Sequence, residues 1–258
     1  MNTLKEKKIP FIETFENKKE NYRAFPIDFV NQSFKENVFE VRDFGIKGEN
    51  FYFRKDNPPY FQRIPNSIPD LLLRKTVIEK LQRVNQKLEK LGLELYVFDC
   101  YRPIEVQNYF YDFWFPNYLQ KVNPKLSGKE LEKEVAKYWA KGAKSSAEVD
   151  LKSPPPHSTG GAIDLTIRRK NGEHLFMGSI FDDVTEVSNT DFFEKKLSKT
   201  QLSFSDQEAL QNRRFLFWLM EEEDFVNNPT EWWHFSYGDQ MWAKISGKKS
   251  AIYSAVKF

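Results

Sequence analysis

The sequence predicts a single α+β domain in which helices pack against a small antiparallel sheet. Three observations carry this prediction. Two amphipathic patterns at residues 70–91 and 207–223 are typical of helices, and short strand-like runs occur at 93–98, 161–168 and 231–237. No internal repeat interrupts the chain, so these elements are expected to share one core.

The chain begins with a charged stretch. We expect residues 1–25 to form a polar extension that is loosely attached to a domain of residues 26–258. Short mixed patterns at 38–41 and 51–53 predict strands, and the polar residues 47–50 predict a turn between them.

The strongest helix pattern spans residues 70–91. Its apolar residues recur every three or four positions, with Pro69 near the start and Gly92 near the end. Residues 93–98 then read as a buried strand that ends at Asp99.

Two helices are expected in the middle of the chain, at 104–119 with an interruption at Pro116 and at 128–141. Three consecutive prolines at 154–156 end regular structure, because they remove backbone donors.

The last third of the chain returns to the sheet. Residues 161–168 alternate as a strand, and Asn171-Gly172 predicts a hairpin turn. Asp206 can cap a helix at 207–223, and the aromatic-rich residues 231–237 read as the final strand.

Composition limits the class of protein. The 258 residues are 40% hydrophobic and 16% aromatic, which suffices for a packed core, and the net charge of +2 argues against a nucleic-acid partner. The single cysteine, Cys100, excludes an intrachain disulfide, and we expect it to fill space in the core. No apolar run of about 18 residues can span a bilayer, and no signal peptide is visible, so a cytoplasmic location is expected, or a periplasmic one if a signal segment has been removed. The oligomeric state is left open.

Two of the three histidines lie in specific motifs. His157 begins the pattern H-x-x-G-x-A-x-D that ends at Asp164, and His234 ends the pattern E-x-x-H that begins at Glu231. A catalytic zinc site needs three protein ligands and an open position. His157, Asp164 and His234 would supply two imidazoles and a carboxylate, which leaves Glu231 as a general base. The third histidine, His174, has no ligand-like context and is expected to be structural.

The E-x-x-H spacing sets a geometric condition. Residues three apart point to opposite faces of a regular strand. Glu231 and His234 can therefore converge only if the chain twists, bulges or begins its strand after Glu231.

The order of the motifs resembles a known family, the D-alanyl-D-alanine dipeptidases of the VanX type, whose wider group includes D-alanyl-D-alanine carboxypeptidases. The resemblance covers roughly residues 70–238. It rests on the segments Asp99-Cys-Tyr-Arg102-Pro, His157-x-x-Gly-x-Ala-x-Asp164, Met177-Gly-x-x-Phe181-Asp182, Asn212-Arg-Arg and Glu231-Trp-Trp-His234.

This resemblance implies roles for the motif residues. It implies that His157, Asp164 and His234 bind one Zn²⁺ ion, that Glu231 is the catalytic base and that Arg102 stabilises the oxyanion. A guanidinium aimed at the developing negative charge suits that last role.

Three further residues are candidates for substrate contact. Asp182 matches an acid that binds the free amino group of the substrate in the family, and Tyr101 lies within the arginine motif. Asp99 could touch the same amine, orient Arg102 or simply cap a turn. One position departs from the family, because Pro155 stands where a serine is common and so lacks its hydroxyl.

The expected activity is zinc-dependent hydrolysis of D-alanyl-D-alanine or a related short D-dipeptide. Two alternatives stay open: a D,D- or L,D-carboxypeptidase that trims peptidoglycan peptides, and a non-catalytic zinc-binding module. The presence of both Glu231 and Arg102 favours an enzyme.

Overall fold

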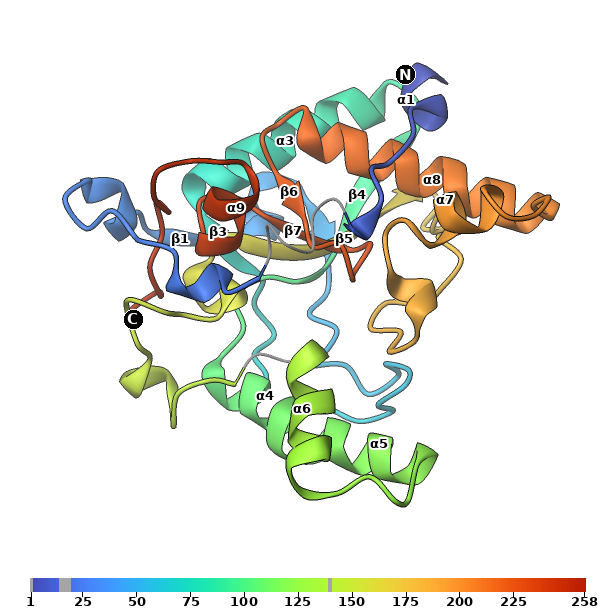
Figure 1. Ribbon diagram of the computed structural model, residues 1–258. Coiled ribbons are helices and arrows are strands. Elements are labelled where there is room, and N and C mark those ends of the chain that lie inside the picture. The colour runs from blue at the N-terminus through green and yellow to red at the C-terminus, as the bar shows by residue number, and fades with distance from the viewer. Residues whose placement is uncertain (1, 14–19, 139–140) are drawn as a thin grey trace.

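A central sheet organises the molecule (Figure 1), seen in a computed structural model that describes residues 2–13, 20–138 and 141–258. Its five strands have the order β2 (Lys47–Gly48), β4 (Leu93–Asp99), β5 (Ala162–Arg169), β7 (His234–Ser236), β6 (Val226–Asn227). All neighbouring pairs are antiparallel except the edge pair β2 and β4. The predicted α+β class with a small antiparallel sheet is confirmed.

Helices occupy two regions around this sheet. The long helices α3 (Lys75–Glu89) and α8 (Phe204–Glu221) lie on one side of it (Figure 1). A separate group of helices extends from the other side: α4 (Ile104–Tyr109), the π-helical turn η4 (Phe110–Trp114), α5 (Phe115–Val122) and α6 (Gly128–Tyr138). The candidate site lies between this group and the sheet.

The predicted start of the first helix is wrong. Residues Leu72–Arg74 form strand β3, which pairs antiparallel with β1 (Val38–Glu40), and α3 begins only at Lys75. The leucine run is equally compatible with a strand, and the partner strand decides the outcome.

The strand predicted at 51–53 is also wrong, because those residues form a turn and the strand lies at Lys47–Gly48. Gly48 permits this pairing. A Cβ atom there would lie 2.6 Å from the Val97 carbonyl oxygen, a distance that only glycine avoids.

The middle and late helices keep their predicted places, with different ends for α5 and α8; residues 139 and 140 of the helix predicted at 128–141 lie outside the described residues. Pro116 does not break its helix but lies in the first turn of α5, directly after the π-helical turn. The cap of α8 is Ser203 rather than Asp206. Asp206 completes the capping box, because the Ser203 N–H donates to its carboxylate.

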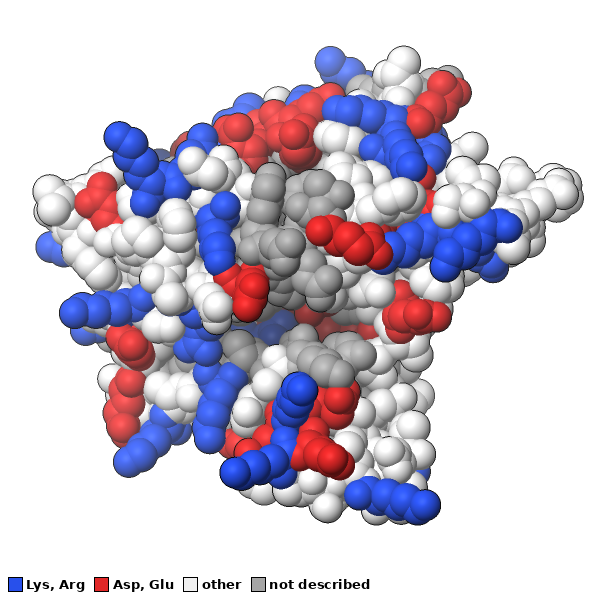
Figure 2. All heavy atoms as spheres, in the orientation of Figure 1, with Lys and Arg blue, Asp and Glu red and all other residues white. Residues whose placement is uncertain are grey.

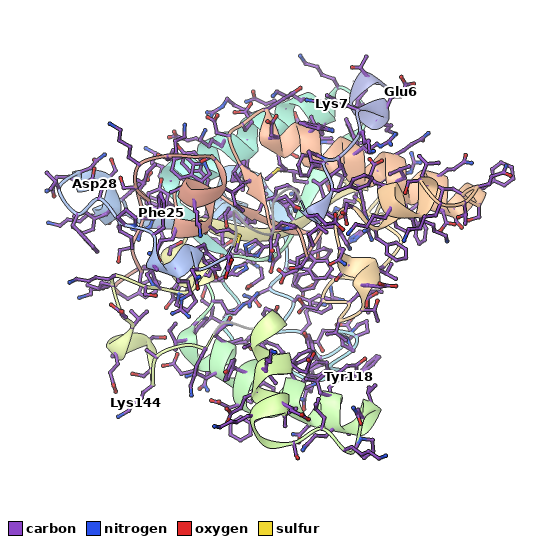
Figure 3. All side chains as sticks on the ribbon, viewed as in Figure 1. Glu6, Lys7, Phe25, Asp28, Tyr118 and Lys144 are labelled. Carbon is purple, nitrogen blue, oxygen red and sulfur yellow. The ribbon has the colours of Figure 1, made fainter. Side chains whose placement is uncertain are left out.

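The loosely attached N-terminus is wrong for the described residues 2–13. Helix α1 (Asn2–Glu6) packs against α8, and Ile9 is only 2% exposed. The Trp218 indole N–H donates to the Lys7 carbonyl at 2.8 Å, and the Ile9 N–H donates to Glu194 Oε1 at the same distance. Figure 3 labels Glu6 and Lys7 at this contact. Within the three described ranges, no helix is long and apolar enough to cross a membrane.

Candidate active site

Three acidic and basic side chains meet because the sheet pairs their positions. Asp99 at the end of β4 is the register partner of Asp164 on β5, which is in turn the partner of His234 on β7. Register partners present their side chains on the same face of a sheet. Segments far apart in the sequence therefore place one row of polar groups across three strands.

A bulge in β4 is needed for this row. Val97 pairs with Leu165, but Asp99 pairs with Asp164, so one extra residue is inserted in β4. Without it Phe98 would face Asp164. Phe98 instead stacks on Phe181, with ring centroids 4.7 Å apart, and closes the adjacent core.

His157 joins the row from outside the sheet. It lies in the 3₁₀ turn η6 (Pro156–Thr159), which the following glycines redirect into β5. Gly160 has φ +69°, and a Cβ on Gly161 would lie 2.4 Å from the Tyr237 carbonyl oxygen. These constraints explain the two glycines of the motif.

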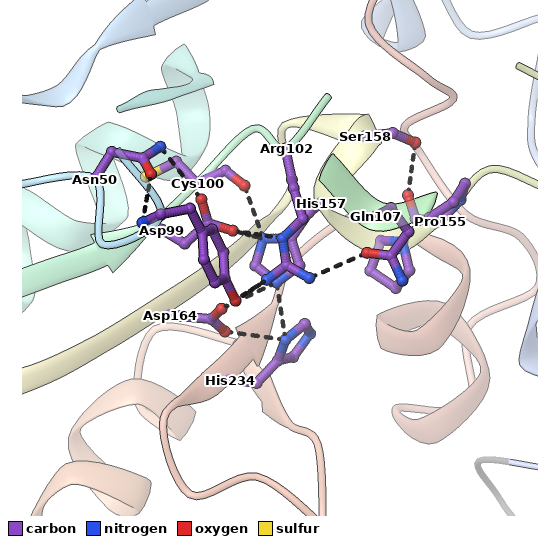
Figure 4. A network of polar contacts seen from close by, with 12 residues as sticks. Asn50, Asp99, Cys100, Arg102, Gln107, Pro155, His157, Ser158, Asp164 and His234 are labelled. Carbon is purple, nitrogen blue, oxygen red and sulfur yellow. Dashed lines mark hydrogen bonds and ion pairs between the residues drawn. The ribbon is translucent and has the colours of Figure 1, made fainter. Parts of the chain in front are cut away.

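Three ligand-type atoms converge at this point (Figure 4). His157 Nε2 lies 3.1 Å from His234 Nδ1 and 3.3 Å from Asp164 Oδ2, and His234 Nδ1 lies 3.1 Å from Asp164 Oδ1. Donor atoms bound to one tetrahedral zinc ion lie about 3.3 Å apart. The buried Asp164 Oδ1 also has no well-aligned hydrogen bond. Spacing and donor chemistry both fit a metal ion such as zinc.

Neighbouring groups fix the two imidazoles in matching orientations. His157 Nδ1 lies 2.7 Å from the Cys100 carbonyl oxygen, which leaves Nε2 free to face the metal position. His234 Nε2 lies 3.3 Å from Ser236 Oγ, which leaves its Nδ1 facing the same position. Burial raises the pKa of Asp164, but the adjacent His157 and His234 outweigh it and hold that pKa well below its ordinary value. Asp164 is therefore a carboxylate.

Glu231 meets the geometric condition set by its spacing. It lies in a turn, and β7 begins only at His234. Its Oε2 is 3.5 Å from His234 Nδ1, and its side chain is 25% exposed, so it faces the cavity. Asn227 holds this turn by donating to the carbonyl oxygens of Glu231 and His234 at 3.1 and 3.0 Å. No sequence pattern indicated Asn227.

Arg102 is braced on four sides (Figure 4). Its Nε donates to Asp99 Oδ2 at 2.8 Å and its Nη1 to Gln107 Oε1 at 3.0 Å. Its Nη2 lies 3.1 Å from Tyr52 Oη and 3.2 Å from Asp164 Oδ2. Of the three roles considered for Asp99, the contacts favour orienting Arg102. The sequence had not indicated Gln107 or Tyr52.

Asp182 lies at the end of a buried hydrogen-bond cluster. The hydroxyls of Tyr52 and Tyr60 both donate to its Oδ2 at 2.8 Å. Burial raises the pKa of Asp182 to about 7, and Arg102 and the two phenols oppose this shift. Its backbone φ is +58°, which is uncommon outside glycine and recurs at functional sites.

Tyr101 is not brought to the site. Its ring packs against Phe258 at a centroid distance of 5.0 Å. Strand β4 ends at Asp99, and Tyr101 lies beyond it, buried and outside the lining of the cavity, so the structure does not bring it to the predicted substrate contact. Cys100 is fully buried, as expected of a core filler. His174 packs against the rings of Tyr96 and Phe98 in a structural role.

The three proposed metal ligands and the polar residues around them line one cavity of about 350 Å³. This volume is within the range of small-molecule binding sites. Its walls include Arg102, Gln107, His157, Asp182 and Glu231. Figure 2 shows a hollow in this region, with Lys and Arg side chains along one rim and acidic side chains toward the other.

Comparison with known proteins agrees with this geometry. The family model described as D-Ala-D-Ala dipeptidase matches residues 63–250. The D-alanyl-D-alanine dipeptidase of Synechocystis sp. is 32% identical over 67% of this chain and 71% of that protein. The enzymes of the same name from Escherichia coli and Enterococcus faecium are 28% and 31% identical, over 64% and 63% of this chain and 65% and 71% of their own lengths. The chain therefore belongs to the D-alanyl-D-alanine dipeptidase family of metallopeptidases, peptidase M15.

Proposed function

We propose that this chain is a zinc-dependent dipeptidase that hydrolyses D-alanyl-D-alanine or a closely related short D-dipeptide. The observation that carries the proposal is the convergence of the three ligand atoms at 3.1–3.3 Å, with Glu231 and Arg102 lining the same cavity. The family membership supports the substrate class.

His157, Asp164 and His234 would hold the ion. A zinc ion bound by them would polarise the peptide carbonyl and acidify water. In this proposal Glu231 accepts the proton of the attacking water and passes it to the leaving amine, which its partial exposure and its distance of 3.5 Å from a proposed ligand atom support.

Arg102 is suited to stabilise the negative charge that develops on the carbonyl oxygen. Its guanidinium is already oriented by Asp99, Gln107 and Tyr52, so no reorganisation is needed as charge develops. The same contacts make Asp99 and Gln107 positioning residues in this proposal.

Asp182 is proposed to bind the free ammonium of the substrate. A buried carboxylate binds a charged ammonium more strongly than the uncharged N–H of an acylated nitrogen, and burial leaves little room for the acyl group. A peptide with a blocked N-terminus should therefore bind poorly.

The test is a panel of dipeptides with the purified, zinc-supplemented protein. D-Ala-D-Ala should be hydrolysed, whereas L-Ala-L-Ala and N-acetyl-D-Ala-D-Ala should be poor substrates. Efficient hydrolysis of the N-acetylated peptide would support a carboxypeptidase instead. Zinc binding without hydrolysis of any peptide would support a non-catalytic zinc module.

The cytoplasmic location and the division of the chain between residues 25 and 26 stay predictions.

A further inference from the structure

A basic residue from outside the family-matching region lines the active-site cavity. Arg23 lies in the 3₁₀ turn η1 (Tyr22–Ala24), and the family match begins only at residue 63. Tyr22 and Arg23 border the same cavity as His157, Glu231 and Met241. The segment before the catalytic domain motifs therefore contributes to the wall of the site.

This turn is held firmly in place. Gln240, the first residue of α9 (Gln240–Ile245), donates to the Arg23 and Lys152 carbonyls at 2.8 and 3.0 Å. Residues Pro26 and Asp28 exchange backbone hydrogen bonds with Ala251. Figure 3 labels Phe25 and Asp28 on this segment, to the left of α9. We call residues 20–28 the N-terminal strap.

The Arg23 side chain is also oriented. Its Nε donates to the Ser153 carbonyl at 3.2 Å, Nη2 donates to the same oxygen, and Nη1 donates to the Lys141 carbonyl at 2.9 Å. These contacts use three of the five N–H groups of a guanidinium. The remaining donors belong to the two terminal nitrogens, which form the planar fork that fits a carboxylate.

Carbonyl oxygens position Arg23 without neutralising its charge. Among residues 2–13, 20–138 and 141–258, no carboxylate lies within ion-pair distance of it. A cation that lines a cavity beside a catalytic centre, oriented but not paired with an acid, is a candidate anion-binding group.

The strap lies close to the catalytic residues. Burial raises the pKa of Tyr22, Arg23 opposes the rise, and the negative charges of Asp239 and Glu231 add to it. Tyr22 is thus near enough to Glu231 to sense its charge, and Arg23 follows Tyr22 in η1.

Charged side chains of both signs line the cavity. Among the acids, Asp182 lies in the segment that leads to η7 (Glu186–Ser188). In Figure 1 this segment, in orange, lies to the right of the centre, and the turn η1, in blue, lies to the left. A free dipeptide is a zwitterion with an ammonium at one end and a carboxylate at the other. The ammonium of such a dipeptide can face Asp182 while its carboxylate faces Arg23.

We propose that Arg23 binds the C-terminal carboxylate of the peptide substrate, a role that rests on the proposed dipeptidase function. Pro155, which also lines the cavity, offers neither a side-chain hydroxyl nor a backbone N–H for that carboxylate. Arg23 is then a specificity-determining residue that selects peptides with a free C-terminus.

The experiment compares two substrates on each variant: D-Ala-D-Ala, and D-alanyl-D-alaninamide, whose C-terminus is uncharged. Wild type should prefer the free acid. Arg23→Gln should raise KM for D-Ala-D-Ala by about 10- to 100-fold with little change in kcat, the loss expected for a hydrogen bond to a charged group. KM for the amide should stay nearly unchanged. Arg23→Lys keeps the charge but loses the fork, so its KM should fall between the two.

Arg63→Gln is the matched control. Arg63 also donates to a backbone carbonyl, that of Phe53 at 3.1 Å, but it is exposed and does not line the cavity. Its KM ratio for the two substrates should equal that of wild type. Because both substrates are assayed on the same preparation, a loss of folded protein cannot change the ratio.

The outcomes are distinct. If Arg23→Gln weakens both substrates equally and lowers Tm, Arg23 only braces the strap and the proposal is overturned. A wild type that cleaves acid and amide equally well also overturns it while leaving the dipeptidase function intact. Failure of wild type to cleave either substrate would remove the dipeptidase function, and the role of Arg23 with it.

Discussion

Replacing Tyr60 by phenylalanine should shift the pH dependence of substrate binding through Asp182. The mutation removes one of the two phenol hydrogen bonds to Asp182 Oδ2 and leaves the aromatic ring and the Tyr52 bond in place. A hydrogen bond to a charged acceptor contributes about 1.5 kcal/mol or more. Because about 1.4 kcal/mol equals one pKa unit, the pKa of Asp182 should rise by about one unit.

The sign of the effect follows from the charge that the substrate needs. With the pKa of Asp182 at about 7, about half of the wild-type carboxyls are ionised at pH 7. A rise of one unit leaves about one-tenth ionised. Only the ionised form attracts the substrate ammonium, so kcat/KM for D-Ala-D-Ala at pH 7 should fall about fivefold. The difference should shrink as the pH rises toward about 8, where the α-amino group itself begins to lose its proton.

The assay is kcat/KM for D-Ala-D-Ala from pH 5.5 to 9 on wild type and Tyr60→Phe. The midpoint of the ascending limb should move from about 7 to about 8. Tyr109→Phe is the control, because the Tyr109 hydroxyl bonds to Gln62 at the surface and not to Asp182. Coincident profiles for wild type and Tyr60→Phe would refute the reasoning.

Three further predictions concern the catalytic groups. Glu231→Gln should lower kcat by about 10²–10⁴-fold while zinc content by elemental analysis stays near one per chain; parallel loss of zinc would identify Glu231 as a ligand instead. Arg102→Ala should lower kcat by about 10²-fold or more with a modest change in KM, and Arg102→Lys should recover little of the lost kcat. A folded, zinc-loaded Arg102→Ala variant with normal kcat would contradict the oxyanion role. Removal of metal by a chelator should abolish activity and lower Tm, and zinc should restore both, whereas His157→Ala should show neither response.

The predicted metal ligands were accessible to sequence analysis because their chemistry is local. The glycines next to His157 are required by a positive φ and by a close backbone approach, and both requirements leave a trace in the sequence. Glu231 and His234 converge because the strand begins late, one of the options that their spacing allowed.

The remaining site residues depend on long-range packing. The β4 bulge decides that Asp99 rather than Phe98 pairs with Asp164, and no pattern in residues 93–99 predicts it. Tyr101 lies beyond the end of the strand and packs against Phe258. Tyr52 and Tyr60 reach Asp182 across more than 120 positions of sequence. Strand β3 was misassigned because a leucine-rich run takes its conformation from its partner β1.

The N-terminal strap has a consequence for how this protein is produced. A fragment limited to residues 63–250 would retain all three predicted metal ligands, Arg102 and Glu231. It would lose β1, with which β3 pairs, and Ala251, to which the strap is bonded. It would also uncover the face of α8 that α1 now covers. Trimming to the recognisable motifs should yield a poorly soluble fragment, and an affinity tag is better placed at the exposed C-terminal Phe258 than against the docked first helix.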